Sequence, residues 1–380
     1  MNPLASLRDV ALARGLAARI AATVDPAREY RLMEFCGGHT HAIYRYGLPE
    51  LLPPNIRFVH GPGCPVCVLP TARLDQAIVL AMNHPVTLCT YGDLLRVPGG
   101  AGHSLLAAKA AGADIRVVYS TQDALALARQ EPRRAVVFLA IGFETTAPAT
   151  AVALQQAQAE RRDNFFVLCN HVLTPPALRA ILADDETRID GILGPAHVST
   201  VIGAAAYEFV AAEFGLPLVV AGFEPLDLLQ SVLWLVAALE RGTAPLLNQY
   251  RRAVSAAGNL KAQELLARTF AVRPRFAWRG LGELPDSALR LADDWAAFDA
   301  ERHFPVAVPP TAEPRGCACP RVLRGLCEPT DCTLFGAPCT PERPIGACMV
   351  SAEGACAAYW HAGRRRALPE HTDTLGVRSA

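Results

Sequence analysis

Two short glycine-rich segments that carry cysteine and histidine constrain this chain more than any other feature. The first is Glu34-Phe-Cys-Gly-Gly-His-Thr-His41, and the second is Gly61-Pro-Gly-Cys-Pro-Val-Cys67. Thiolates and imidazoles are the ligands that proteins offer to iron, copper and zinc, and glycine lets a backbone come close to a ligand. The sequence therefore predicts a scaffold that presents these two segments for chemistry.

The composition favours a compact protein of two or three domains. The chain has 380 residues, of which 51% are hydrophobic, and a formal net charge of zero, as is typical of globular proteins. No basic block suggests a nucleic-acid partner, and no apolar run approaches the ~18 residues of a membrane helix. Because 12 cysteines accompany no visible secretory signal, we expect a cytoplasmic protein with metal or redox chemistry.

Strand-like and helix-like stretches alternate along the first 230 residues. Apolar runs such as 56–60, 86–91 and 135–143 end in glycine-containing loops, a pattern that predicts an α/β fold with parallel sheets. A shift of 133 positions brings the loop at 61–64 onto the loop at 194–197. We therefore expect two similar parallel-sheet α/β domains around a cleft, with ligands bound at the carboxyl ends of the strands.

The predicted domain boundaries follow this alternation. Residues 1–30 are expected to form an N-terminal helix, 31–125 the first α/β domain and 126–230 a second one that repeats the first. From residue 231 the sequence pattern changes to helix-like stretches, among them 246–254, and then to a cysteine-rich tail. Residues 231–380 are therefore expected to form a third, mainly helical and irregular domain.

Several side chains in the loops are candidates for chemistry. Cys64 and Cys67 form a C-x-x-C pair, which serves as a dithiol redox centre or as half of a metal site. Cys36 lies beside two glycines, so its sulfur is expected to be accessible. His39 and His41 could both meet one ligand, or each could be an ordinary hydrogen-bonded side chain.

Carboxylates and a further histidine occupy other strand ends. Glu144 could act as a general base or hold a histidine in place, or it could be an acid that the dipole of a helix N-terminus stabilises. Asp93, His171 and Glu224 occupy comparable loop positions and are weaker candidates.

The tail carries the strongest metal signal. Seven cysteines lie between residues 317 and 356, namely Cys317, Cys319, Cys327, Cys332, Cys339, Cys348 and Cys356. Four thiolates can hold a [4Fe–4S] cluster or a zinc ion. The spacing disfavours a zinc ribbon, and spacing alone does not say which four cysteines bind.

Taken together, these motifs resemble those of the HypD family of hydrogenase maturation factors. Besides the two opening segments, the resemblance rests on Thr90-Tyr-Gly-Asp93, Gly142-Phe-Glu-Thr-Thr146, Gly222-Phe-Glu-Pro225 and the tail from Cys348 to Cys356. It implies assembly of the Fe(CN)2CO unit of [NiFe]-hydrogenase by a scaffold with redox chemistry, and not by a conventional turnover enzyme. It also implies two partners, a HypC-type small chaperone that brings iron and a HypE-type donor of cyanide.

The resemblance further implies roles for individual residues. The iron-binding thiol of the family maps to Cys36, where iron(II) would carry cyanide and carbonyl ligands, and the redox pair maps to Cys64 and Cys67. His39 or His41 would orient groups or transfer protons, with Glu144 as their support. The [4Fe–4S] ligands map to Cys317, Cys332, Cys339 and Cys356, and the choice between Cys317 and Cys319 stays open.

Two other functions compete with this one. A stand-alone iron–sulfur oxidoreductase or dehydratase would turn over a small molecule without protein partners. A structural metal protein would hold zinc in the tail and would be colourless, whereas a [4Fe–4S] protein is brown.

Overall fold

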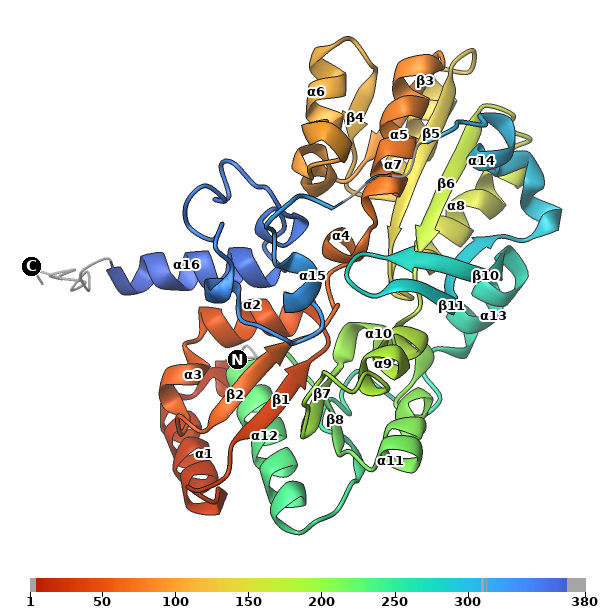
Figure 1. Cartoon of the computed structure of the whole chain (residues 1–380). Helices are drawn as coiled ribbons and strands as arrows, with labels where there is room; N and C mark the ends of the chain where they lie inside the picture. Colours follow the sequence, from red (N-terminus) through yellow and green to blue (C-terminus); the bar gives the residue numbers. More distant parts are fainter. Residues whose placement is uncertain (1–4, 309–310, 312, 368–380) are drawn as a thin grey trace, which may run out of the picture.

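The computed structural model describes residues 5–308, 311 and 313–367. Its strands form two parallel sheets and one antiparallel pair. Figure 1 shows the two sheets in separate lobes, with the antiparallel pair and the C-terminal cysteine-rich segment beside the junction of the lobes. The predicted α/β class, with two sheet-containing units and an irregular C-terminal region, is confirmed.

The first sheet has five strands in the order β2-β1-β7-β8-β9. Helix α12 packs on its strands and against α1. The strands are β1 (Tyr30–Glu34), β2 (Ile56–His60), β7 (Gly191–Pro195), β8 (Leu218–Ala221) and β9 (Leu246–Asn248). The helices of this lobe are α1 (Val10–Thr23), α2 (Gly37–Arg45), α3 (Leu48–Leu51), α10 (Ala196–Ile202), α11 (Glu208–Phe214) and α12 (Pro225–Glu240).

The second sheet has four strands in the order β4-β3-β5-β6. The strand β5 is buried along almost its whole length, as expected for a central parallel strand. The strands are β3 (Val86–Thr90), β4 (Ile115–Val117), β5 (Ala135–Gly142) and β6 (Phe165–His171). The helices before, between and after them are α4 (Pro65–Val68), α5 (Thr71–Asn83), α6 (Leu105–Ala110), α7 (Thr121–Gln130), α8 (Ala147–Ala159) and α9 (Thr174–Leu182).

The sheets do not follow the predicted division into 31–125 and 126–230, because each of these segments contributes strands to both sheets. The reason is that β1 pairs in parallel with β2 on one side and with β7 on the other. The loops at 61–64 and 194–197, which suggested a repeated domain, follow β2 and β7 of the same sheet. Their similarity therefore reflects a shared position at the sheet edge.

After α12 the chain departs from the expected mainly helical region. The stretch predicted as a helix over 246–254 begins with the short edge strand β9. Helix α13 (Leu260–Thr269) then leads into the hairpin of β10 (Phe270–Trp278) and β11 (Gly282–Leu291), which the sequence analysis did not predict. Strand β11 packs against β6 of the second sheet and against α9, the helix that leads from β6 to β7 of the first sheet. The hairpin therefore lies at the junction of the two lobes (Figure 1).

The last part of the chain is short-helical and irregular. It contains α14 (Ala300–His303), α15 (Cys319–Val322) and α16 (Ala355–Ala367). Helix α16 packs on α2 of the first lobe. The predicted third domain runs to residue 380, and its last residues, 368–380, lie outside the described part.

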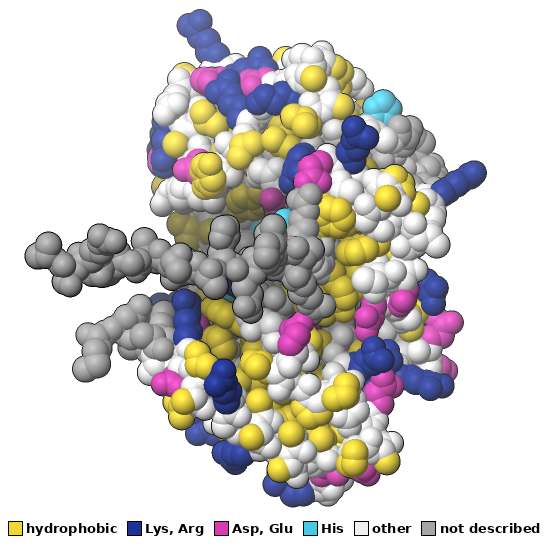
Figure 2. Space-filling model, turned by 90° about the vertical axis from the view of Figure 1, so that its left-hand side faces the viewer, with side chains coloured by type: hydrophobic (Ala, Val, Ile, Leu, Met, Phe, Trp, Pro, Cys, Tyr) yellow, Lys and Arg dark blue, Asp and Glu magenta, His cyan; other side chains and the backbone are white. Residues whose placement is uncertain are grey.

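The surface is mixed in character. On the face shown in Figure 2, Lys and Arg side chains lie beside Asp and Glu side chains, with hydrophobic side chains between them, as is usual for globular proteins. In the described residues, no helix combines the length and the apolar character that crossing a membrane requires.

A partly buried charge cluster attaches the hairpin to the second sheet. Glu301 of α14 pairs with Arg73 of α5 at 2.5 Å and with Arg273 of β10. Both guanidinium groups also donate to the carbonyl oxygen of Cys169 in β6. Burial by itself would raise the pKa of Glu301, but the two arginines outweigh it and lower the pKa to about 2.

This cluster predicts a pH-dependent stability. Because the pKa of Glu301 is lower in the folded state, its contribution is present above about pH 4.5 and is lost as the pH falls towards 2. We expect Glu301→Gln to lower the free energy of unfolding by about 3 kcal/mol at pH 7. Denaturant unfolding at several pH values would measure it, and the difference from wild type should shrink between pH 5 and 3.

The matched control is Glu283→Gln, because Glu283 forms an exposed pair with Arg275 at 3.6 Å on the same hairpin. We expect a change below about 1 kcal/mol there. Equal effects of the two substitutions at pH 7 would contradict the assigned role of Glu301.

Candidate active site

Cys36 lies where β1 ends and α2 begins, in an extended conformation at the N-cap of the helix. The backbone of Gly63, which follows β2, packs directly on it. A Cβ atom at Gly63 would lie 2.5 Å from the nitrogen and 2.6 Å from the Cα of Cys36. The amide of Gly37 donates to the carbonyl oxygen of Gly63 at 3.1 Å. The two glycine-rich segments thus touch through their backbones, which a side chain at position 63 would prevent.

The thiol of Cys36 is covered by side chains that arrive from three other segments. Nδ1 of His197, at the start of α10, lies 3.7 Å from Sγ, and the ring of Phe223 stacks on His197 at 4.0 Å. Glu353, just before α16, lies against Gly37. Burial, and then the charge of Glu353, raise the pKa of Cys36 to about 12. The thiol is therefore protonated near neutral pH and only 6% exposed.

The two histidines of the first segment have different surroundings. His39 is fully buried, and its Nε2 lies 2.9 Å from the carbonyl oxygen of Ala221 at the end of β8. Its Nδ1 has no hydrogen-bond partner in the part of the chain that the structure describes. Burial lowers the pKa of His39 to about 4, so the ring is neutral at pH 7. His41 instead lines a separate pocket between α2 and α16, together with His361.

A buried carboxylate, that of Glu34, forms hydrogen bonds within the first segment. Glu34, 1% exposed, accepts from the amide of Cys36 at 3.3 Å and from the hydroxyl of Thr40. Its Oε1 also lies 2.7 Å from Nδ1 of His60 at the end of β2. Burial is the largest influence on Glu34 and raises its pKa. These bonds fix the turn that presents Cys36.

The carboxylate of Glu144 forms hydrogen bonds with the start of helix α9. Its two oxygens accept from the amide and the hydroxyl of Thr174, at 2.8 and 2.9 Å, at the start of α9. Burial raises the pKa of Glu144 to about 7. No hydrogen bond from Glu144 to His39 or His41 occurs in the described part of the chain, so its predicted support of these histidines stays a prediction.

Cys64 and Cys67 lie at the short helix α4, in which Cys67 is the third residue. Cys64 is its N-cap, and Sγ of Cys64 lies 3.4 Å from the amide nitrogen of Cys67, which donates to it. Both are buried free thiols. Burial, and then the neighbouring Cys64, raise the pKa of Cys67 well above its usual value. The pair is thus present as a dithiol in a dry environment.

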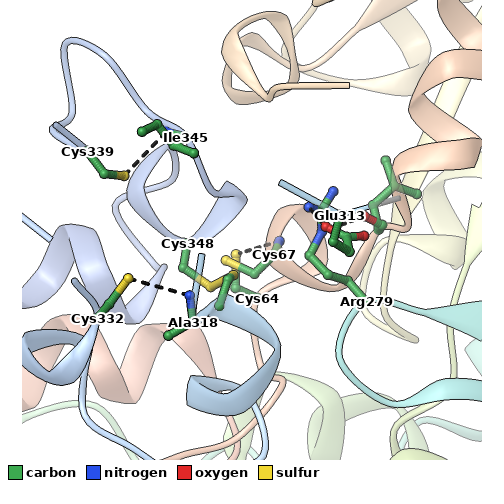
Figure 3. The surroundings of a disulfide bond; sticks show 11 residues. Cys64, Cys67, Arg279, Glu313, Ala318, Cys332, Cys339, Ile345 and Cys348 are labelled. Carbon is green, nitrogen blue, oxygen red and sulfur yellow. Dashed lines mark hydrogen bonds and ion pairs between the residues drawn. A yellow bond between two sulfur atoms is a disulfide. The ribbon is translucent and has the colours of Figure 1, made fainter. Parts of the chain in front are cut away.

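A disulfide between Cys319 and Cys348 lies next to this dithiol. Figure 3 shows Cys348 beside Cys64 and Cys67, and α4 packs against the turn Ala347–Met349. Sequence analysis left Cys348 without a role and left the choice between Cys317 and Cys319 as cluster ligand open. Cys319 is bonded to Cys348. Of Cys317 and Cys319, Cys317 is therefore the one with a free thiol.

The other tail cysteines gather around one region. The pKa of Cys317 is raised to about 11 by burial and then by Cys332 and Cys339. Burial and then Cys317, Cys339 and Cys332 raise the pKa of Cys356. Cys327, which is not among the four proposed ligands, has a weaker effect on the pKa of Cys356 than Cys317, Cys339 and Cys332.

These thiols have surroundings that suit an iron–sulfur cluster. Backbone amides donate to sulfur, from Ala318 to Cys332 at 3.4 Å and from Ile345 to Cys339 at 3.3 Å (Figure 3). Such bonds tune the potential of clusters. A Cβ atom at Gly346 would lie 2.5 Å from Sγ of Cys317, so glycine leaves the room for that sulfur.

Among the described residues, no three His, Cys, Asp or Glu side chains lie close enough together to hold a single metal ion. A four-iron cluster binds each thiolate at a different iron, so its ligands surround a larger group than one ion.

Sequence reasoning missed three functional neighbours of Cys36, namely His197, Phe223 and Glu353. Two of them were visible as motifs, because His197 ends the Gly194-Pro-Ala-His loop and Phe223 lies in Gly222-Phe-Glu-Pro. Both loops follow strands of the same sheet as Cys36. The missing information was the order of the strands, which places the end of β7 next to the end of β1 and the end of β8 next to that of β7.

Comparison with known proteins identifies relatives along nearly the whole chain. The HypD family model, described as "Hydrogenase formation hypA family", matches residues 11–363. A hydrogenase maturation factor HypD from Azotobacter vinelandii is 58% identical over 371 residues, which cover 96% of this chain and 98% of that protein. HypD from Rhizobium leguminosarum bv. viciae is 57% identical, with 98% of both chains covered. HypD from Escherichia coli K12 is 52% identical, with 88% of this chain and 89% of that protein covered.

The close packing of the two segments gives a direct test. We expect Gly63→Ala to lower the free energy of unfolding by about 1–3 kcal/mol, because the added methyl group overlaps backbone atoms of Cys36 that cannot move independently. Denaturant unfolding measures the change. The control is Gly15→Ala in α1, where a Cβ atom has open space and should stabilise the helix by about 0.5–1 kcal/mol. A neutral Gly63→Ala would contradict the described contact.

Proposed function

The chain belongs to the HypD family, and we propose that it acts in hydrogenase maturation as the scaffold on which the Fe(CN)2CO unit of [NiFe]-hydrogenase is assembled. One observation carries the proposal. The buried thiol of Cys36 and the dithiol of Cys64 and Cys67 lie on two segments whose backbones touch at Gly63. A site for iron and a source of two electrons are thereby held side by side.

Iron is the cargo of this site, and Cys36 is its proposed anchor. Iron(II) with cyanide and carbonyl ligands prefers soft thiolates, and a HypC-type chaperone would supply a second one. Because burial keeps Cys36 protonated, iron binding must release a proton. His197, whose Nδ1 is 3.7 Å from the sulfur, is the nearest base to accept it.

His39 has a different proposed part. Its ring is held at Nε2 beside the carbonyl oxygen of Ala221, and no described residue forms a hydrogen bond with its Nδ1. A buried and neutral imidazole of this kind can orient a ligand or transfer a proton near the iron. His41 lines the pocket between α2 and α16, so its proposed part is less direct than that of His39.

The dithiol is proposed to drive the transfer of cyanide from the thiocyanate of a HypE-type donor. The two thiols become one disulfide and release two electrons and two protons. The electrons break the bond between sulfur and carbon of the thiocyanate, and cyanide passes to iron. One proton goes to the departing thiolate of the donor and the other is released, so that atoms and charges balance.

The tail is proposed to hold a [4Fe–4S] cluster on Cys317, Cys332, Cys339 and Cys356. Amide donors to two of these sulfurs, and the space that Gly346 leaves for a third, support the assignment. When bound, such a cluster would supply electrons one at a time. A dithiol that donates electrons needs a reducing compartment to be restored, and we propose a cytoplasmic location.

The assignment of iron to Cys36 is tested by Cys36→Ala. In anaerobic protein co-expressed with its small chaperone, we expect the infrared bands of iron-bound cyanide and carbonyl to disappear, while the visible absorption of the cluster persists. The matched control is Cys89→Ala, because Cys89 is buried inside β3 and has no proposed part. Bands of wild-type intensity in Cys36→Ala would show the assignment to be wrong.

The same spectrum of wild-type protein tests the function itself. Cyanide and carbonyl bands would support the scaffold. Their absence, with cluster and chaperone both present, would favour the stand-alone iron–sulfur oxidoreductase.

A further inference from the structure

Arg279 is a buried cation whose position the proposed function does not use. It lies at the tip of the β10–β11 hairpin, between Trp278 and Gly282. Its side chain is 1% exposed. Burying a guanidinium group is costly unless its charge and its donors are satisfied. A buried arginine at the tip therefore indicates a structural or functional role for its charge.

The backbone and side chain of Arg279 hold the end of the helix that carries the dithiol. Its amide donates to the carbonyl oxygen of Val68 at 2.9 Å, and its Nε donates to that of Leu69 at 3.1 Å. Val68 is the last residue of α4 and Leu69 is its C-cap. A cation at this end also opposes the negative pole of the helix.

Glu313 completes the anchoring. It accepts from Nη1 of Arg279 at 2.5 Å and from the hydroxyl of Thr71, at the start of α5, at 2.9 Å. Nη2 of Arg279 is buried and has no hydrogen-bond partner among the described residues. The guanidinium group therefore retains one donor that the neighbouring protein groups do not use.

The tip also touches the cysteine-rich segment. A Cβ atom at Gly280 would lie 2.9 Å from the Cα and the carbonyl oxygen of Pro320, which follows Cys319. Figure 3 shows Arg279 and Glu313 on the side of Cys64 and Cys67 that faces away from Cys332 and Cys339. The charge of Arg279 thus lies at the junction between the dithiol helix and the tail.

We propose that Arg279 is a positioning residue of the Cys64–Cys67 couple, which fixes the end of α4 and uses its buried charge to favour the reduced dithiol over the disulfide. This inference rests on the proposed redox role of the pair. A nearby cation stabilises a thiolate, which the dithiol can form and the disulfide cannot. The effect on the couple is therefore expected at alkaline pH, where a thiol of the pair ionises, and the test is made there. In line with this, Arg279 opposes the effect of burial, which raises the pKa of Cys67.

The test is the equilibrium of the couple with glutathione in the purified full chain. One glutathione disulfide oxidises the two thiols and yields two glutathione thiols. After free thiols are blocked with N-ethylmaleimide, the tryptic fragment 58–73 reports the pair alone, because Cys64 and Cys67 are its only cysteines. The ratio of blocked to disulfide-linked fragment then gives the equilibrium constant.

Arg279→Gln should favour the disulfide by about tenfold, equivalent to about 30 mV for a two-electron couple. Arg279→Lys keeps the charge and should stay within about threefold of wild type. The matched control, Arg275→Gln, removes an arginine that is 76% exposed on the same hairpin and should leave the equilibrium unchanged. A merely structural role would not separate the lysine variant from the glutamine variant in this way.

Glu313→Gln provides an independent arm, because it removes the counter-charge of Arg279 at a side chain that is 33% exposed. We expect a shift in the opposite direction, towards the dithiol. If Arg279→Gln does not fold, this variant decides. An Arg279→Gln or Glu313→Gln protein with the equilibrium of wild type would overturn the inference about Arg279. A wild-type chain that forms no Cys64–Cys67 disulfide at any glutathione ratio would overturn the redox role itself.

Discussion

The contact between the backbones of Gly63 and Cys36 is the constraint on which the rest of the site depends. It requires β1 and β2 to be parallel neighbours in register, from Tyr30 opposite Ile56 to Glu34 opposite His60. It also requires both strands to end at the same level. Glu34 and His60, the last residues of the two strands, then meet in a buried hydrogen bond at 2.7 Å. The chemistry of the sulfur atoms is thus built on a simple property of parallel sheets.

Burial is the second common feature of the site. Cys36, Cys64, Cys67 and His39 are all nearly inaccessible, and burial is the largest influence on the pKa of Cys36, Cys67 and His39. Neutral thiols and a neutral imidazole result. Such a site carries little charge of its own, so a bound cation would meet soft ligands in a medium that strengthens electrostatic interactions.

The sequence predicted the local elements better than their arrangement. The strand over 56–60 has the predicted bounds, and the strands within 86–91 and 135–143 end one residue earlier than predicted, because each is a mainly apolar run that ends close to a glycine. The division of strands between sheets could not be predicted, since pairing of β1 with β7 joins residues about 160 positions apart and leaves no local signal. The β10–β11 hairpin escaped prediction because Pro274 and Pro285 interrupt its strands.

In the candidate site, too, the sequence predicted individual residues better than their arrangement. Cys36, Cys64 and Cys67 could be singled out from residue type and flanking glycines, which are properties of the segment itself. His197 approaches Cys36, and Phe223 stacks on His197, only because β7 lies beside β1 and β8 beside β7 in the sheet. Arg279 comes from the unpredicted hairpin and has no motif around it. Contacts of this kind depend on tertiary structure, which a single sequence does not encode in any short pattern.

The interleaving of the two sheets has a consequence for the order in which a growing chain can fold. When residues up to 190 have left the ribosome, all four strands of the second sheet are available, but only β1 and β2 of the first. Domains fold as units during synthesis, so the second lobe can form while Cys36 still lacks its neighbour His197. At that stage the first sheet also lacks its central strand, β7. The thiol reaches its enclosed surroundings only when the later strands dock, and a half-made chain offers iron an incomplete site.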